Sequence, residues 1–481
     1  MWPVIIWILT AAWAAPCGMP ALWDQPIPPM MALPAPPPGA PTRDVYGVPN
    51  ELVSEHVVLR WGDGANISAA NITRLADAFE DAWDAEVDTL GMPPPLGSTS
   101  YRLNVYVGDS GGNTPSANGA SGYYWYDSQG WPMIVLSLAT AQDPVYGKTV
   151  AAHELFHALQ AATGSYQYGE GEAGAWFFEA SAEWAIGEVF PGAPEASVML
   201  GPFALKPHLA LGNFDYPDEG LLVEGYQYGA FIFPRYLSEH VLDAEAIRDI
   251  WTEAESDDPL DTIDTLLEGD LHRQVARFYA HNVTWDYAEG SRYREVVDLW
   301  LGSYPGADDR YAAALGMAQA DGSERVVDAP LPRDLGANVI RIARPDCGTL
   351  AARLDGDAVG SEGSEAAWEG VLTDGTRHVH LSGGAGNIDL DGARPVSLVV
   401  VPSAPGSGLL ETFDYRYSLS FEAAALDDPL CAVSGGGGAP SVDLPVGSGG
   451  FSTGSTGCGC QANGTVWYPW WAVVLVAWRR R

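Results

Sequence analysis

The chain is short of basic residues, and this shortage argues against one large class of partner. It has 481 residues, with 24 Lys and Arg against 62 Asp and Glu, for a formal net charge of −38. The phosphates of a nucleic acid would be repelled by such a surface, so we expect no nucleic-acid partner. The sequence also lacks an EF-hand or a nonapeptide calcium loop. We therefore interpret the acidity as a solvated surface.

Cysteine is scarce, and the N-terminus lacks the basic residues that begin many export signals. Residues 1–14 are nevertheless apolar, and Ala12-Trp13-Ala14 is typical of a cleavage site, so we predict a signal peptide over 1–14 and export. Cys17 follows Pro16, which fits a lipoprotein-processing site poorly. Export permits disulfides, and Cys347 and Cys431 could form one if their Cα atoms lie within about 7 Å.

The composition of the remaining chain predicts two folded domains between linkers. Residues 15–44 are rich in proline and are predicted to form an extended spacer, and 433–457 form a Gly/Ser linker. Strand and helix patterns in 45–328, followed by short alternating strands in 329–432, predict an α+β domain and then an all-β sandwich. In the first domain we expect a helix over 68–90 and a hairpin over 123–138.

Residues 458–481 form an unusual tail. Cys458 and Cys460 precede an apolar run over 466–478 and three terminal arginines. The run is shorter than the about 20 residues that a membrane-spanning helix needs. The tail resembles the myxobacterial C-terminal sorting signal, which implies processing or lipid modification of a cysteine. The product would be associated with the outer membrane at the cell surface, or secreted, with membrane contact only through the tail; a plain short anchor is the alternative.

The motif His153-Glu154-Leu155-Phe156-His157 predicts a metal site on a helix that ends at Gly164. Residues four apart share a helix face, so both imidazoles can bind one ion, and Glu154 points toward a water on that ion. A catalytic zinc site needs a third protein ligand, and we choose Glu179 on a second apolar helix. Glu183 lies one turn later on the same face, where it could accept a hydrogen bond from a ligand histidine.

These residues resemble the gluzincins, zinc peptidases whose ligands are two histidines and a glutamate. The segment Trp176-Phe-Phe-Glu179-Ala-Ser-Ala182 is close to the third-ligand helix of the aminopeptidase branch, with Ala180 in place of a glycine. In thermolysin-like members an Asp stands where this chain has Glu183. The resemblance implies a zincin-like metallopeptidase domain in which the strand over 133–138 borders the substrate.

The same resemblance implies a tyrosine that stabilises the oxyanion. Tyr226 is our candidate and Tyr228 the reserve, because Tyr226-x-x-Gly229 precedes an apolar helix. The alternative is a packed aromatic helix start. The chain lacks the Gly-x-Met-Glu-Asn element with which the aminopeptidase branch anchors a free amine, which favours internal cleavage or a different substrate.

The sequence therefore predicts an exported zinc-dependent endopeptidase acting on a protein or peptide substrate. His153, His157 and Glu179 would hold Zn²⁺, and Glu154 would be the general base. Two alternatives stay open: a cell-surface binding or adhesion protein on a zincin scaffold, and a zinc hydrolase of non-peptide substrates. His378 and His380 share one strand face and could bind metal, although an ordinary histidine pair is the more frequent reading. The oligomeric state is not predicted.

Overall fold

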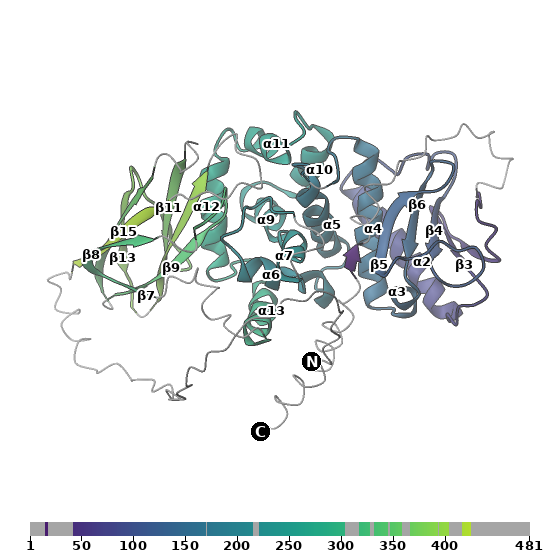
Figure 1. Ribbon diagram of the computed structural model, residues 1–481, viewed down its shortest axis with the longest axis horizontal. Coiled ribbons are helices and arrows are strands. Elements are labelled where there is room, and N and C mark those ends of the chain that lie inside the picture. The colour runs from purple at the N-terminus through teal and green to yellow at the C-terminus, as the bar shows by residue number, and fades with distance from the viewer. Residues whose placement is uncertain are drawn as a thin grey trace, which may run out of the picture. The chain divides into compact units, whose positions relative to one another are not determined.

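The computed structural model describes Ala15–Cys17 and most of the chain between residues 42 and 424 (Figure 1). Within that span, the residues that are not described are 170, 215–220, 304–316, 328–330, 345–346, 358–365, 393 and 404–415. The predicted signal peptide, most of the Pro-rich linker, the Gly/Ser linker and the sorting tail with Cys458 and Cys460 lie outside the described residues. So does Cys431, so its pairing with Cys347 stays a prediction.

The first domain contains a six-stranded sheet with the order β1-β5-β6-β4-β3-β2. Its strands are β1 (Ala15–Cys17), β2 (Asn50–Val53), β3 (Val57–Trp61), β4 (Leu103–Val107), β5 (Ala120–Tyr126) and β6 (Pro132–Leu136). β3, β4 and β6 run parallel, whereas β5 runs antiparallel to β6. The predicted hairpin is therefore confirmed. Its second arm, β6, lies between β5 and β4, so the expectation that this strand borders the substrate at a sheet edge is wrong. Asp127 closes its turn by accepting hydrogen bonds from the backbone N–H groups of Gln129 and Trp131.

The helix predicted for 68–90 is confirmed as α2 (Ala69–Trp83), which continues into the π-helix η2 (Asp84–Thr89). The side chain of Ser68 caps it by accepting the Asn71 N–H at 3.1 Å. One apolar stripe of α2, including Leu75 and Phe79, is buried. The short helix α3 (Leu138–Gln142) follows β6.

Two central helices, α4 (Tyr146–Thr163) and α5 (Ala175–Val189), are buried on all sides along most of their length. In α4 every residue from 149 to 160 is buried, and in α5 every residue from 175 to 186. A helix that is apolar all round belongs in the interior, and these two pack against each other while α4 also packs on β5 and β6. Gly164 ends α4 at φ +67°, a left-handed conformation that favours glycine.

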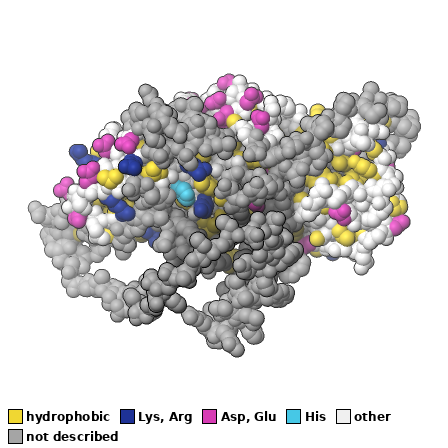
Figure 2. All heavy atoms as spheres, viewed as in Figure 1, with side chains coloured by type: hydrophobic (Ala, Val, Ile, Leu, Met, Phe, Trp, Pro, Cys, Tyr) yellow, Lys and Arg dark blue, Asp and Glu magenta, His cyan; other side chains and the backbone are white. Residues whose placement is uncertain are grey.

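Shorter helices complete the first domain behind α5. They are η3 (Pro194–Ser197), α6 (Leu200–Leu205), α7 (Leu221–Glu224), α8 (Tyr226–Gly229), α9 (Ile232–Tyr236), η4 (Leu237–Val241), α10 (Ala244–Thr252), α11 (Pro259–Leu266), α12 (Leu271–Asn282) and α13 (Gly290–Ser303). Acidic side chains gather on the surface over α10 and α11 (Figure 2), where Glu253, Asp257 and Asp261 are exposed. This solvated acidic surface agrees with our interpretation of the net charge.

The strands that follow form two sheets packed around one apolar core, and the α+β class is confirmed. The strands are β7 (Met317–Gln319), β8 (Asp321–Val327), β9 (Asn338–Ala343), β10 (Gly348–Gly356), β11 (Ala367–Thr373), β12 (His378–His380), β13 (Ala385–Leu390), β14 (Val396–Ser403) and β15 (Tyr417–Ala424). Because β7 and β8 belong to these sheets, the strand region begins before the predicted boundary at 329. None of the described helices is long and apolar enough to cross a membrane.

Candidate metal centre

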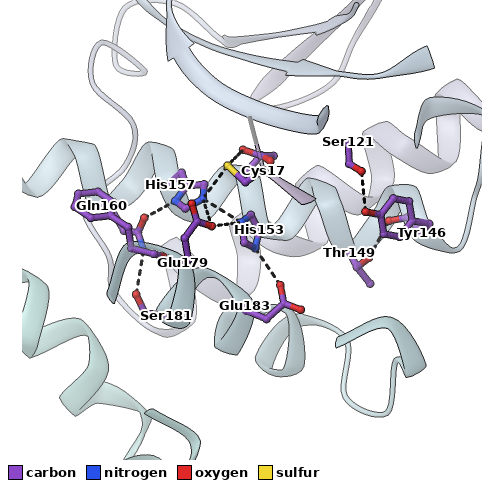
Figure 3. Close-up of polar contacts among 12 residues, drawn as sticks. Cys17, Ser121, Tyr146, Thr149, His153, His157, Gln160, Glu179, Ser181 and Glu183 are labelled. Atoms are coloured by element: carbon purple, nitrogen blue, oxygen red, sulfur yellow. Dashed lines mark hydrogen bonds and ion pairs between the residues drawn. The ribbon is translucent and has the colours of Figure 1, made fainter. Parts of the chain in front are cut away.

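The two histidines of the motif and Glu179 meet in the interior between α4 and α5 (Figure 3). The spacing of four residues places both imidazoles on one face of α4, and their Nε2 atoms lie 3.0 Å apart. Glu179 comes from the facing side of α5. Its Oε2 lies 3.2 Å from His153 Nε2 and 3.5 Å from His157 Nε2.

A fourth group, the thiol of Cys17, completes the cluster. Its Sγ lies 3.5 Å from His157 Nε2 and 3.9 Å from Glu154 Oε2. The ligand atoms of Cys17, His153, His157 and Glu179 all lie within 4.8 Å of one another, and all four residues are buried. Cys17 reaches this place because β1 pairs with the free edge of β5, with Cys17 opposite Gly122.

This donor set fits a metal ion. Two imidazole nitrogens, one carboxylate oxygen and one sulfur are ligands that zinc accepts in a tetrahedral arrangement. With metal–ligand bonds of about 2.0 to 2.3 Å, such ligand atoms lie roughly 3.3 to 3.6 Å apart. The four closest separations in the cluster run from 3.0 to 3.5 Å. The buried cluster could therefore hold a metal ion.

The charge of Glu179 also favours a bound cation. Burial alone would raise the pKa of Glu179, but His157 and His153 hold that pKa well below its usual range. Burial alone would lower the pKa of His153, but hydrogen bonds to Glu179 and Glu183 raise it to about 10. Burial lowers the pKa of His157. The lowered pKa keeps Glu179 a carboxylate in this dry site, and a carboxylate is the form of the side chain that binds a metal.

Each ligand histidine is oriented through its other ring nitrogen. His157 Nδ1 donates to Gln160 Oε1 at 2.6 Å, which leaves Nε2 to face the cluster. Gln160 is itself held, because its Nε2 donates to Phe178 O and to Ser181 Oγ. Glu183 Oε2 lies 3.3 Å from His153 Nδ1.

Glu154 lies next to the cluster and is completely buried. No hydrogen-bond partner of its Oε1 is found within the described part of the chain. Burial raises the pKa of Glu154 to about 8, His153 opposes this rise, and Glu179 adds to it. A carboxyl group whose pKa lies near neutrality can both accept and return a proton.

Gly122 of β5 explains how strand and helix come so close at Glu154. A Cβ built on Gly122 would lie 2.9 Å from Val150 Cγ1 and 3.0 Å from Glu154 Cγ and Oε1. Any side chain at this position would collide with the motif helix. A glycine inside a strand is a known signal of such a close approach, but our sequence reasoning did not use it.

The tyrosines are distributed differently from the prediction. The Tyr226 hydroxyl donates to Leu209 O at 3.4 Å and its ring packs on Phe203, and we find no contact between it and the cluster in the described residues. The reserve candidate, Tyr228, has its ring centroid 6.2 Å from that of His153. Tyr168, which we did not predict, donates to Glu179 Oε1 at 2.5 Å.

Sequence reasoning missed three further buried polar residues. Cys17 stood in the predicted spacer, and Gln160, three residues after His157, was not singled out in the motif helix. Glu86 of η2 is buried, burial raises its pKa well above the usual range, and His153 lowers it. The available signal for Glu86 was a charged residue at the spacing of the apolar stripe of an amphipathic helix. The predicted pair His378 and His380 lies elsewhere, beside His281 and Glu369 respectively.

The comparisons with known proteins give one finding. Residues 42–369, more than half of the chain, match a family described as "Family of unknown function (DUF6055)". A search of curated proteins gives no match.

Proposed function

Because the chain belongs to the DUF6055 family, whose function is not known, we propose a function from its own residues: an exported, zinc-dependent endopeptidase with a gluzincin-like site in a zincin-like domain. One observation carries the proposal. Two histidines, Glu179 and a separate carboxylate, Glu154, are buried together at the edge of a β-sheet. A site that only held a metal would have no need for Glu154, which is not one of the proposed ligands.

His153, His157 and Glu179 would hold the ion, with Glu183 and Gln160 fixing the two imidazole rings. A zinc ion bound there would polarise the scissile carbonyl and lower the pKa of a water toward about 7. Glu154 would accept the proton of the attacking water at a carboxylate oxygen and return it to the leaving amine. Its burial supports this role because it keeps the pKa of the carboxyl group near neutrality.

The edge of β5 supports a peptide as the substrate. Among the described strands, β5 is bordered on one side by β6 and on the other by the three-residue strand β1. An extended main chain therefore fits along β5, with a side chain that reaches the cluster. Strand addition of this kind gives affinity through main-chain hydrogen bonds. Near the site, Tyr228 is a better placed oxyanion donor than Tyr226, since its ring lies beside that of His153.

The test uses a mixed peptide library read by mass spectrometry, with the zinc-loaded full chain and its Glu154→Gln variant. Both are assayed with Cys17 and with Cys17→Ser, because the Cys17 thiol contacts Glu154. We expect cleavage that Glu154→Gln lowers by about 10² to 10⁴ while the zinc content stays unchanged. Glu195→Gln is the matched control, because Glu195 is a buried carboxyl group outside the cluster.

Three results separate the alternatives. Cleavage lost only in Glu154→Gln supports the peptidase. Equal cleavage by Glu154→Gln removes Glu154 from the role of base. If no form with bound zinc cleaves any peptide, the peptidase proposal fails, and a binding protein or a zinc hydrolase of other substrates takes its place.

A further inference from the structure

We propose that Cys17 is a fourth metal ligand and that strand β1 is a built-in occupant of the peptide-binding edge of β5, so that the chain holds its own site closed. This inference rests on the proposed function for the meaning of the site. Its chemical core, a bond between the Cys17 sulfur and the metal, can be tested without any activity.

The register places the thiol. β1 runs parallel to β5, with Ala15 opposite Ala120 and Cys17 opposite Gly122. Gly122 is the residue on which a Cβ would lie 3.0 Å from the Glu154 side chain of α4. Whatever residue pairs with Gly122 is therefore carried to the point where the sheet edge and the motif helix meet. In this chain that residue is a cysteine, and its side chain is fully buried.

The thiol stands where a reaction would need space. It contacts His157 Nε2, a proposed ligand atom, and Glu154 Oε2, the proposed base. A catalytic zinc site has three protein ligands and one open position, whereas a site with four protein ligands is closed. With Cys17 in place, neither a water nor a substrate carbonyl can lie between Glu154 and the ligand set.

The closure is built to be reversible. Cys17 belongs to β1 and not to α4, so its departure breaks no backbone hydrogen bond of the α4 helix. β1 has three residues and one partner strand, so few backbone hydrogen bonds hold it. An extended peptide that pairs with the Ala120–Gly122 edge would compete directly with β1.

When Cys17 binds the metal, its thiol exchanges a proton for the metal ion. The S–H bond of Cys17 breaks, one S–metal bond forms, and the proton goes to solvent; nothing is oxidised or reduced. Opening reverses this exchange. The predicted cleavage after residue 14 would leave Ala15–Cys17 on the mature chain, so the occupant would survive export. A lipid-modified Cys17 could not occupy this buried position.

The experiment loads the full chain with Co²⁺ as a spectroscopic probe and compares it with Cys17→Ser and Cys17→Ala. We expect the near-ultraviolet thiolate-to-cobalt absorption in the unsubstituted chain and its loss in both variants, with Co²⁺ still bound. Alkylation of Cys17, followed on its own peptide by mass spectrometry, should be slow with metal bound and fast after chelation. Intact mass confirms that Cys17 is present and carries no lipid.

Peptide cleavage gives the second readout. If the closed form makes up nine-tenths or more of the chain, Cys17→Ser should cleave about ten-fold faster or more, because the competent fraction limits the rate. The matched control is the same substitution combined with Glu154→Gln, which should stay inactive.

The outcomes keep the two proposals apart. An unchanged cobalt spectrum in Cys17→Ser, or equal cleavage by both forms, overturns the inference while leaving the peptidase standing. A lost thiolate band with no cleavage by any form supports Cys17 as the ligand and overturns the peptidase. A lost band together with faster cleavage supports both.

Discussion

Two groups of histidines differ in how their rings are arranged: His153 with His157, and His240 with His281 and His378. His153 and His157 meet edge to face at 89°, with their Nε2 atoms 3.0 Å apart and beside Glu179. His240, His281 and His378, the tilted group, instead lie with their rings inclined to one another at 37° and 39° and with centroids 4.2 and 4.4 Å apart. The nitrogens of the first group point to one place, whereas the rings of the tilted group contact one another at an angle.

The surroundings of the two groups differ as well. The four residues of the first cluster are buried, and their other polar atoms are held by Gln160, Glu183 and Tyr168. In the second group His240 Nε2 is already used by Asp286 O at 2.7 Å, and His240 and Asp286 are exposed. Nearness of histidines and an acid is therefore not enough. Convergent, dry and oriented nitrogens make the first group the stronger candidate for a metal site.

The largest expected effect is the loss of metal from the first group alone. Glu179→Ala removes a ligand, so bound zinc should fall from about one ion per chain to almost none. Asp286→Ala, the matching change in the tilted group, should leave the zinc content unchanged. Elemental analysis of both purified variants measures this. Loss of a zinc ion from the Asp286→Ala variant would show that the tilted group also binds metal.

The next effect tests the orientation of the rings. Glu183→Ala should weaken zinc binding about 10- to 100-fold, because His153 loses the carboxylate at its Nδ1. A competition titration against a chelator gives the affinity. Glu195→Ala serves as the control, since it also removes a buried carboxylate. Equal affinities for the two variants would deny Glu183 an orienting role.

A smaller effect is expected from crowding at the sheet edge. Gly122→Ala forces a Cβ to within 3.0 Å of Glu154 and Val150, so the free energy of unfolding should fall by about 1 to 3 kcal/mol. Gly302→Ala in α13 is the control, because a Cβ there meets nothing within 4 Å and alanine favours helix. Denaturant unfolding compares them. A fully stable Gly122→Ala chain would mean that β5 can shift away from α4.

The last expected effect is a pH dependence that belongs to the tilted group. Burial, then the charges of His378 and His240, lowers the pKa of His281 to about 3, while Asp286 opposes the shift and Arg277 adds to it. The folded chain thus binds this proton less readily than the unfolded chain. His281 contributes no penalty above about pH 6.5, and stability is lost as the pH falls from there toward 3.

Thermal unfolding across this range measures the effect. His281→Gln removes the titrating group, so its melting temperature should fall less between pH 6.5 and pH 4 than that of the unsubstituted chain. Parallel curves for the two chains would assign the acid sensitivity to other groups, of which His208 is one, with a pKa lowered to about 4 by burial, Lys206 and Arg333.

Much of the fold could be predicted because its signals are local. The apolar stripe of 68–90, the alternation in the hairpin and the glycine after residue 163 each act through neighbours in sequence, and α2, the β5–β6 hairpin and α4 follow from them. The strands begin before the predicted boundary at 329. β7 has only three residues, and β8 is exposed along most of its length, so neither carries the alternating apolar pattern of a strand.

Only part of the candidate site could be predicted, because some of its residues are brought together by contacts between distant segments and not by local spacing. His153 and His157 are four residues apart, so helix geometry brings them together whatever the rest of the chain does. Tyr168 and Cys17 have no such local constraint. Tyr168 is placed by the turn between α4 and α5, and Cys17 by a strand pairing more than 100 residues away. Two nearby tyrosines, Tyr226 and Tyr228, have different surroundings because residues two apart lie on nearly opposite sides of a helix, about 200° apart round its axis.

The sequence by itself determined the pair of histidines, the buried character of α4 and α5, and the negative surface, because periodicity and composition act within one helix or over the whole surface. Glu179 could be chosen from its place on a second apolar helix, but only the tertiary structure decided its distance from those histidines and which thiol joins them. Both depend on how α5 crosses α4 and on which strand borders β5, and contacts between distant segments leave no pattern in either segment alone.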